Sequence, residues 1–114
     1  MSDARAWLGK TVKIQIDRPL SSRHPTHGFF YPLNYGFLPG VPGKDGEELD
    51  AYLLGVFEPV EEGEGTVIAV IERLNDADDK LVLAPPGKRY SREQIAALVE
   101  FQERFFESHI IMMD

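Results

Sequence analysis

Four carboxylates stand close together near the middle of the sequence, in the stretch DGEELDAYL. Asp45, Glu47, Glu48 and Asp50 begin at a glycine turn, and the last of them enters an apolar strand. A solvated acidic turn accounts for Glu48 but poorly for Asp50, because aspartate is disfavoured in strands and costly near a core unless paired or metal-bound. Carboxylates this dense repel one another without a cation. They suit Mg2+, whose other coordination positions are taken by water and substrate phosphates.

A second acidic run, NDADDK, ends at Lys80. Asp76, Asp78 and Asp79 can form an Asx-rich hairpin turn, which is the preferred interpretation for at least one of them. A calcium-binding EF-hand loop is excluded, because Lys80 takes a ligand position and Leu81 replaces the required glycine. If this hairpin folds toward the first cluster, Asp78 completes a metal site and Lys80 supplies a cation beside it.

The elements that must position these residues are mostly strands. Thr11–Asp17 alternates apolar and polar residues and predicts a half-buried strand, which Pro19 ends. The following stretch, to Asp45, is rich in proline and glycine and predicts ordered turns, with one short strand around Phe29–Tyr31. Aliphatic runs joined by the loop PVEEGEG predict three further strands, at 49–57, 66–74 and 81–84.

The C-terminal segment has a helical period. Ser91 and Gln94 form a capping box, and apolar residues recur at three-to-four spacing from Ile95 to Phe106. This predicts one amphipathic helix whose apolar face lies on the sheet. Strands first and a helix last indicate a mainly β fold with a C-terminal α-helix, arranged as a small closed or nearly closed β-barrel.

Composition limits the possible functions. A length of 114 residues predicts a single domain spanning 1–114. The absence of cysteine excludes disulfides, thiolate metal sites and cysteine nucleophiles. With no apolar leader or membrane-length segment, we expect a cytoplasmic protein without a membrane partner. A net charge of -7 disfavours nucleic-acid binding, although metal ions can bring a small anion to carboxylates.

Three stretches of the sequence, in the right order, resemble the family I soluble inorganic pyrophosphatases. YPLNYGFLPG is followed by DGEELDAYL and then DADDKLV, and the resemblance covers roughly residues 12–107. Two such motifs at the right separation are more specific than either alone. The resemblance implies an OB-like β-barrel, a Mg2+ requirement, hydrolysis of pyrophosphate to two phosphates, and homo-oligomers.

The resemblance also implies roles for the acidic residues. Asp45, Asp50 and Asp78 match metal-binding aspartates, and Asp50 and Glu47 fall in the catalytic signature. Glu47 stands where the family has an aspartate that acts as base toward the nucleophilic water. Its extra methylene moves the carboxylate by about 1 Å, and misplacement of that order can cost about a hundredfold in rate.

Three further residues match groups that bind phosphate in the family, namely Lys80, Tyr35 and Arg23. Other family features are missing. Arg73 stands five residues before Asp78, where the family has a metal-binding aspartate, and a hairpin with a lysine and a glutamate is deleted before Arg23. Gln15 replaces a glutamate, and His109 and Ile110 replace a Tyr-Lys pair.

These matches and losses leave two main hypotheses open. The first is Mg2+-dependent hydrolysis of pyrophosphate or a related small phosphoanhydride. The alternative is a catalytically impaired relative that binds a metal, a phosphate compound or a partner protein as a regulatory module. The histidines are also open: His24 and His27 are either exposed loop residues or contacts to an anion or a replacement base, and His109 is either a phosphate ligand or a surface residue.

Overall fold

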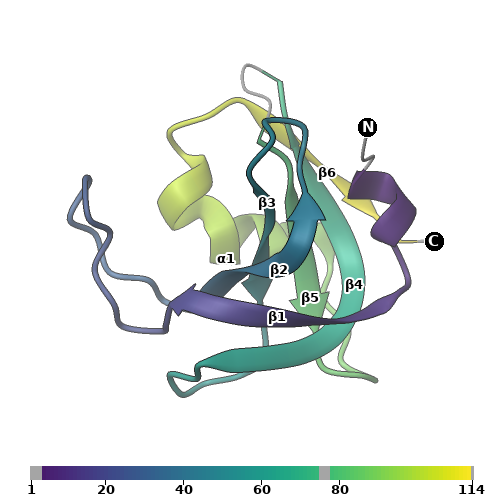
Figure 1. Cartoon of the computed structure of the whole chain (residues 1–114), viewed down its shortest axis with the longest axis horizontal. Helices are drawn as coiled ribbons and strands as arrows, with labels where there is room; N and C mark the ends of the chain where they lie inside the picture. The colour runs from purple at the N-terminus through teal and green to yellow at the C-terminus, as the bar shows by residue number, and fades with distance from the viewer. Residues whose placement is uncertain (1–3, 75–77, 114) are drawn as a thin grey trace.

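Six β-strands, one α-helix and a short 3-10 helix make up the fold, which a computed structural model describes for residues 4–74 and 78–113 (Figure 1). In chain order these are η1 (Ala4–Trp7), β1 (Thr11–Arg18), β2 (Asn34–Pro42), β3 (Glu48–Leu53), β4 (Glu62–Arg73), β5 (Lys80–Ala84), α1 (Arg92–Glu103) and β6 (Ser108–Met112). Within the described residues, no helix has the length and apolar character needed to cross a membrane.

Five of the strands close into a barrel, as predicted. The sheet runs β1-β2-β3-β5-β4-β6, and an additional pairing of β1 with β4 closes its first five strands into the barrel, with β6 attached to β4. The pairing of β3 with β5 is parallel, and the others are antiparallel. The first part of β4 pairs with β1 and its last part with β6, so the length of β4 allows it to hold both. Closure leaves few strand edges open to other chains.

The aliphatic runs of β3 and β5 are explained by burial on both faces. Leu49, Ala51 and Leu53 of β3 belong to one hydrophobic cluster, which also contains Leu81 and Leu83 of β5. The residues between them, Tyr52 and Val82, belong to a second cluster with Ile95 and Val99 of α1. Alternate side chains therefore fill the barrel or pack against the helix. Because both faces of these strands are buried, their sequences do not alternate between apolar and polar residues as a half-exposed strand does.

The C-terminal helix begins as predicted and ends earlier. Ser91 Oγ accepts a hydrogen bond from the Gln94 amide at 3.0 Å, and the Gln94 side chain accepts one from the Ser91 amide at 2.7 Å. The helix ends at Glu103, so Phe105 and Phe106 lie beyond it and not on its face. Both residues happen to stand at helical spacing in the sequence, but they belong to the turn that follows the helix.

Two strands were not predicted. β2 lies in the proline- and glycine-rich stretch, and β6 follows directly after the helix. Gly36 explains why β2 needs glycine: a Cβ there would lie 1.7 Å from the carbonyl oxygen of Gln15. The strand predicted at Phe29–Tyr31 is reduced to a single bridge between Arg23 and Phe30, and part of the predicted loop PVEEGEG forms the start of β4.

Candidate active site

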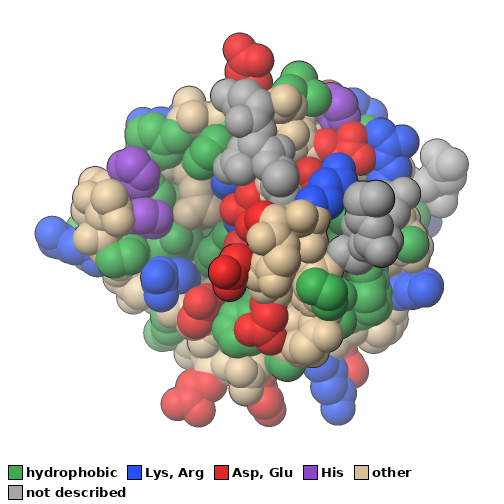
Figure 2. Space-filling view, turned by 45° about the horizontal axis from the view of Figure 1, so that its top comes forward, with side chains coloured by type: hydrophobic (Ala, Val, Ile, Leu, Met, Phe, Trp, Pro, Cys, Tyr) green, Lys and Arg blue, Asp and Glu red, His purple; other side chains and the backbone are tan. Residues whose placement is uncertain are grey.

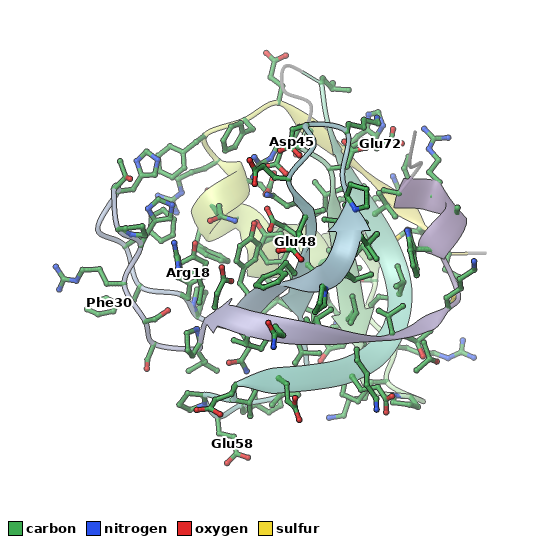
Figure 3. The ribbon with its side chains drawn as sticks, viewed as in Figure 1. Arg18, Phe30, Asp45, Glu48, Glu58 and Glu72 are labelled. Atoms are coloured by element: carbon green, nitrogen blue, oxygen red, sulfur yellow. The ribbon has the colours of Figure 1, made fainter. Side chains whose placement is uncertain are left out.

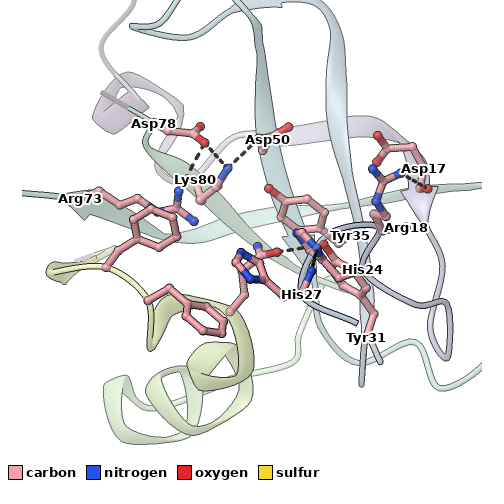
Figure 4. Close-up of a pocket in the computed structure, with 13 residues that line it drawn as sticks. Asp17, Arg18, His24, His27, Tyr31, Tyr35, Asp50, Arg73, Asp78 and Lys80 are labelled. Atoms are coloured by element: carbon pink, nitrogen blue, oxygen red, sulfur yellow. Dashed lines mark hydrogen bonds and ion pairs between the residues drawn. The ribbon is translucent and has the colours of Figure 1, made fainter. Parts of the chain in front are cut away.

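A cavity of about 330 Å3 lies where the ends of several strands meet the loop after β1 and the end of α1 (Figure 4). Figure 2 shows acidic side chains gathered on one face of the molecule, with histidine side chains beside them. The cavity is lined by Asp17, Arg18, His24, His27, Tyr31, Tyr35, Asp50, Arg73, Asp78, Lys80, Gln102, Phe105 and Phe106. It therefore combines carboxylates, cations and aromatic rings.

Lys80 is the central cation of this cavity. The parallel pairing of β3 with β5 places Asp50 directly beside Lys80. The Lys80 ammonium, only 2% exposed as a residue, donates to Asp50 Oδ2 at 2.6 Å and to Asp78 Oδ2 at 2.7 Å. Burial raises the pKa of Asp78, although Lys80 acts in the opposite direction. The Tyr35 ring lies 5.5 Å from the ammonium, and burial raises the pKa of Tyr35 well above its ordinary value.

Arg73 is a second buried cation and joins the barrel to the helix. It donates to both carboxylate oxygens of Glu103, at 3.1 and 2.9 Å, and lies 3.4 Å from Asp78 Oδ2. Its guanidinium also covers the Phe106 ring at 3.6 Å. Burial disfavours the charged guanidinium, but the hydrogen bonds to Glu103 outweigh this and raise the pKa of Arg73. Tyr52 donates a further hydrogen bond to Glu103 at 2.6 Å.

The hydrogen-bond network continues from this pair to the loop after β1. Gln102 donates to the Tyr52 hydroxyl oxygen at 2.8 Å and accepts from the Tyr31 hydroxyl at 2.8 Å. Burial raises the pKa of Tyr31 to about 12. Both tyrosines are therefore neutral donors at physiological pH, and they hold the floor of the cavity in one arrangement.

Asp17 and Arg18 enter the cavity together because β1 is irregular. Consecutive residues in a regular strand point to opposite faces. The pairing of β1 with β2 shifts register between Ile16 and Arg18, which allows both neighbours to line the same cavity. Burial raises the pKa of Asp17, and the adjacent Arg18 partly opposes that effect.

His24 is held as a neutral hydrogen-bond donor. Its Nδ1 faces the backbone amides of Thr26 and His27, each at 3.0 Å, and therefore accepts from both. The ring proton of the neutral form then resides on Nε2. Burial, followed by His27 and Arg18, lowers the pKa of His24, so the ring is neutral at physiological pH. His24 can donate to a ligand through Nε2, but Nδ1 is not available as a replacement base.

The structure brings part of the predicted set together and places the rest elsewhere. Asp50, Asp78, Lys80 and Tyr35 line the cavity. Asp45 and Glu47 are exposed in the turn between β2 and β3, at the tip of which Figure 3 shows Asp45. In that turn Asp45 Oδ1 accepts a hydrogen bond from the Glu47 amide at 3.0 Å.

Arg23 and His109 also lie away from the cavity lining. The Arg23 guanidinium covers the Phe30 ring at 4.8 Å, at the outer edge of the loop where Figure 3 shows Phe30, and Arg18 lines the cavity instead. His109 pairs with Glu72 at 2.8 Å.

The second acidic run divides between the cavity and its surroundings. Asp79 is buried outside the cavity lining, with Oδ2 at 2.9 Å from Lys44, whereas Asp78 lines the cavity. Asp76, named for the acidic turn, lies outside the described residues.

Sequence reasoning missed Asp17, Arg18, Arg73 and Glu103 as cavity or network residues. The last two carried a readable signal, because Arg73 ends an aliphatic strand and Glu103 lies one residue after the buried Gln102 of the helix. A charge in such a position must be paired. Asp17 and Arg18 carried none, because a strand irregularity is not visible in the residue pattern.

The carboxylates of the cavity were compared with the needs of a metal ion. Across 4–74 and 78–113, no three histidine, aspartate or glutamate side chains lie close enough together to hold one. Asp50 and Asp78 nevertheless each direct one oxygen to the same point, which the Lys80 ammonium occupies. Because Mg2+ is commonly held by one or two carboxylates, with water and substrate phosphates completing its shell, this pair fits such an ion in exchange for Lys80.

Comparisons with known proteins point to one protein family. Residues 8–110 match the family described as inorganic pyrophosphatase. The inorganic pyrophosphatase of Neisseria meningitidis serogroup A is 31% identical over 106 residues, which are 89% of this chain and 56% of that protein. That of Haemophilus influenzae is 35% identical over 88 residues, or 73% of this chain and 47% of that protein. The chain thus spans about half the length of these curated relatives.

Solved structures show the same fold. The inorganic pyrophosphatase of Ehrlichia chaffeensis superposes with a TM-score of 0.74 at 16% identity, covering 93% of this chain and 88% of that chain. The structure from Coxiella burnetii gives 0.64 at 18% identity, covering 94% and 87%. The match over residues 8–110, together with the identity to the relative from Neisseria meningitidis, places this chain in the inorganic pyrophosphatase family.

Proposed function

We propose that this protein hydrolyses inorganic pyrophosphate, or a related small phosphoanhydride, to phosphate with Mg2+ as its cofactor. The main observation in support is that Lys80 lies within hydrogen-bonding distance of both Asp50 and Asp78 in one cavity. Two carboxylates and a lysine at this distance supply the charges of a phosphoryl-transfer site. Family membership supports the same reaction.

The side chains of the cavity have distinct roles in this proposal. Lys80 and Arg18 bind phosphate oxygens, and Tyr35 contributes a hydroxyl whose pKa is too high for it to ionise. Asp50 and Asp78 hold the metal ion. When bound, that ion would favour deprotonation of water near neutral pH and offset the charge that develops on the leaving phosphate.

The predicted metal ligand Asp45, the predicted base Glu47 and the predicted phosphate ligand Arg23 remain proposals at the edge of the site. They lie on two loops that flank the strands bearing Asp50 and Arg18. A movement of these loops on ligand binding would be needed to bring them to the substrate. The cytoplasmic location and homo-oligomeric assembly expected from the sequence belong to the same proposal.

A second candidate function is favoured by the ion pairs themselves. Lys80 and Arg73 already form ion pairs with Asp50, Asp78 and Glu103. A cavity whose carboxylates are already paired with its own cations can bind a phosphate compound without hydrolysing it. This is the catalytically impaired module that the loss of family residues suggests.

Phosphate release from pyrophosphate, measured with and without Mg2+, distinguishes the two functions. We expect Mg2+-dependent release that Asp50→Ala lowers by at least about a hundredfold, because one of two metal-holding carboxylates is lost. Glu58→Ala is the matched control, since Glu58 is exposed and, as Figure 3 shows, points away from the barrel. Binding of pyrophosphate without metal-dependent release would favour the impaired module.

A further inference from the structure

Aromatic rings cover one wall of the cavity. Figure 4 shows Asp50, Asp78 and Lys80 on one side, with His24, His27 and further rings on the other. Pyrophosphate is all charge and hydrogen-bond acceptor, so it gains nothing from a wall of rings. The aromatic wall thus indicates a ligand with a flat apolar part, which pyrophosphate itself lacks.

Three of the rings near the cavity are almost parallel. His27 and Phe105 stack at 4.6 Å between centroids with 11° between their planes. Phe29 lies 6.0 Å from each, tilted by 5° from His27 and by 15° from Phe105. We call these three rings the aromatic platform. Phe105 is 47% exposed, although large apolar side chains are usually covered.

The platform joins two segments that are distant in sequence. His27 and Phe29 come from the loop after β1, and Phe105 follows the end of α1. His27 and Phe105 both line the cavity that contains Lys80. A ligand bound through phosphates at Lys80 can therefore reach the platform with its other end.

We propose that the cavity takes phosphoanhydrides that carry a flat aromatic ring, of the chemical class of nucleoside diphosphates. This inference rests on the proposed function, since the same charged wall binds the two phosphates. The base stacks on the aromatic platform, an interaction available to every base because each has a π face. A cavity of about 330 Å3 is within the range of about 300 to 1,000 Å3 typical of sites for small organic ligands.

The reaction balances with water as the only co-reactant. The water oxygen bonds to the terminal phosphorus, and the bond from that phosphorus to the bridging oxygen breaks. The bridging oxygen stays with the nucleoside monophosphate, and the terminal group leaves as inorganic phosphate. The water protons pass to the products and to solvent.

A free nucleotide fits the charge of the molecule better than a nucleic acid does. The net charge of -7 opposes a long phosphate backbone. A single diphosphate needs only the local cations, of which Arg18, Arg73 and Lys80 line the cavity.

Binding to two non-hydrolysable ligands tests the proposal on the full chain with Mg2+ present. The ligands are α,β-methylene-ADP and methylenediphosphonate, which share the diphosphate but differ in the nucleoside, and calorimetry gives both dissociation constants. We expect the nucleotide analogue to bind about tenfold more tightly, because tenfold corresponds to about 1.4 kcal/mol, which lies within the about 1 to 3 kcal/mol that stacking contributes per base.

Two variants assign this difference to the platform. Phe105→Leu keeps an apolar side chain but removes the flat face, and it should abolish most of the tenfold preference. His27→Leu removes the neighbouring ring at an exposed loop position. It serves as the second test if Phe105→Leu lowers the midpoint of thermal unfolding. Leu98→Ala is the control, because Leu98 is exposed on α1 and does not line the cavity.

The possible results separate this inference from the proposed function. Equal affinity for the two ligands, together with Mg2+-dependent pyrophosphate hydrolysis, would overturn the aromatic platform as a binding surface and leave the proposed function intact. A preference unchanged in both Phe105→Leu and His27→Leu would overturn it as well. Absence of both binding and pyrophosphate hydrolysis would overturn the two proposals together.

Discussion

Lys80 shows how one buried cation can organise a site. A buried ammonium is tolerated only with close partners, and here Asp50 and Asp78 supply them at hydrogen-bonding distance. The same two carboxylates would otherwise repel one another. In the proposed reaction, Lys80 would keep these two carboxylates together until Mg2+ and phosphate bind, and would then exchange its carboxylate partners for phosphate oxygens.

The proton acceptor of the reaction can be identified by comparing two carboxylates. Asp17 lies in the cavity with a raised pKa, whereas Glu47 is exposed in the turn between β2 and β3. If the loop stays in place during catalysis, we expect Asp17→Asn to lower kcat by about a hundredfold, the size typical of general base catalysis. Glu47→Gln should then change kcat by less than about threefold.

Steady-state kinetics on pyrophosphate with saturating Mg2+ provides the measurement for both carboxylates. A large loss of kcat in Glu47→Gln, with little change in Asp17→Asn, would instead show that the turn moves to the substrate. A rise in KM with kcat unchanged would assign either residue to substrate binding.

The interactions of Glu72 with Arg5 and His109 should make the free energy of unfolding depend on pH in the acid range. Hydrogen bonds from Arg5, at 2.5 and 2.8 Å, and from His109 lower the pKa of Glu72 to about 2. A lowered folded-state pKa contributes stability that is present above the unfolded-state pKa and is lost as pH falls through the folded-state value. This contribution is therefore present at neutral pH and disappears between about 4.5 and about 2.

Chemical denaturation as a function of pH tests the role of Glu72. We expect Glu72→Gln to lower the free energy of unfolding by about 1 kcal/mol at pH 7, the upper end for partly exposed ion pairs, and by less near pH 2. Glu100→Gln is the control, because Glu100 pairs with Arg104 on an exposed helix face. A Glu72 effect that does not change with pH would contradict the assignment.

At the scale of elements, the close approach of β1 and β2 decides where the cavity residues lie. The Gly36 backbone contacts that of Gln15, and the register shift two residues later turns Asp17 and Arg18 into the cavity. β1 and β2 can approach in this way only because Gly36 has no side chain. The geometry of the cavity therefore depends on a glycine that does not line it.

Gly36→Ala tests this dependence. The added Cβ would lie 1.7 Å from the carbonyl oxygen of Gln15, a backbone atom that no side-chain rotation moves, so we expect a loss of about 3 kcal/mol or more in the free energy of unfolding. Gly43→Ala is the matched control, because its nearest contact would be an ordinary 3.5 Å. Urea denaturation of both variants gives their free energies of unfolding. Equal values would show that the close approach of β1 and β2 at Gly36 is not required.

At the scale of the whole molecule, the negative charge makes ligand binding depend on cations. A net charge of -7 repels free pyrophosphate, whereas a complex with Mg2+ carries less charge. The buried network from Lys80 through Asp78 and Arg73 to Glu103 connects the barrel with the helix, so a ligand in the cavity stabilises both.

Thermal unfolding in the presence of ligands tests this coupling. At a free ligand concentration of a hundred times the dissociation constant, linkage predicts about 2.7 kcal/mol of added stability. We expect methylenediphosphonate to raise the unfolding midpoint only when Mg2+ is also present. A rise with the diphosphonate alone would show that Lys80, Arg18 and Arg73 bind the anion without a metal.

The sequence by itself determined the chemistry and the fold class of this protein. The acidic motifs, the tyrosine motif and the capping box were readable because each depends on residues near one another in the chain. Asp50, Asp78 and Lys80 were predicted in this way and Tyr35 from the family resemblance, and all four line the cavity.

The tertiary structure decided which charges share the cavity. Asp17 and Arg18 enter through a strand irregularity, and Arg73 is held by Glu103, which lies thirty residues away. β2 and β6 form because partner strands are available, although the residues of β2 favour turns and β6 lies outside every strand that the sequence pattern predicts. These features depend on the free energy of contacts between distant segments, which local residue patterns do not encode.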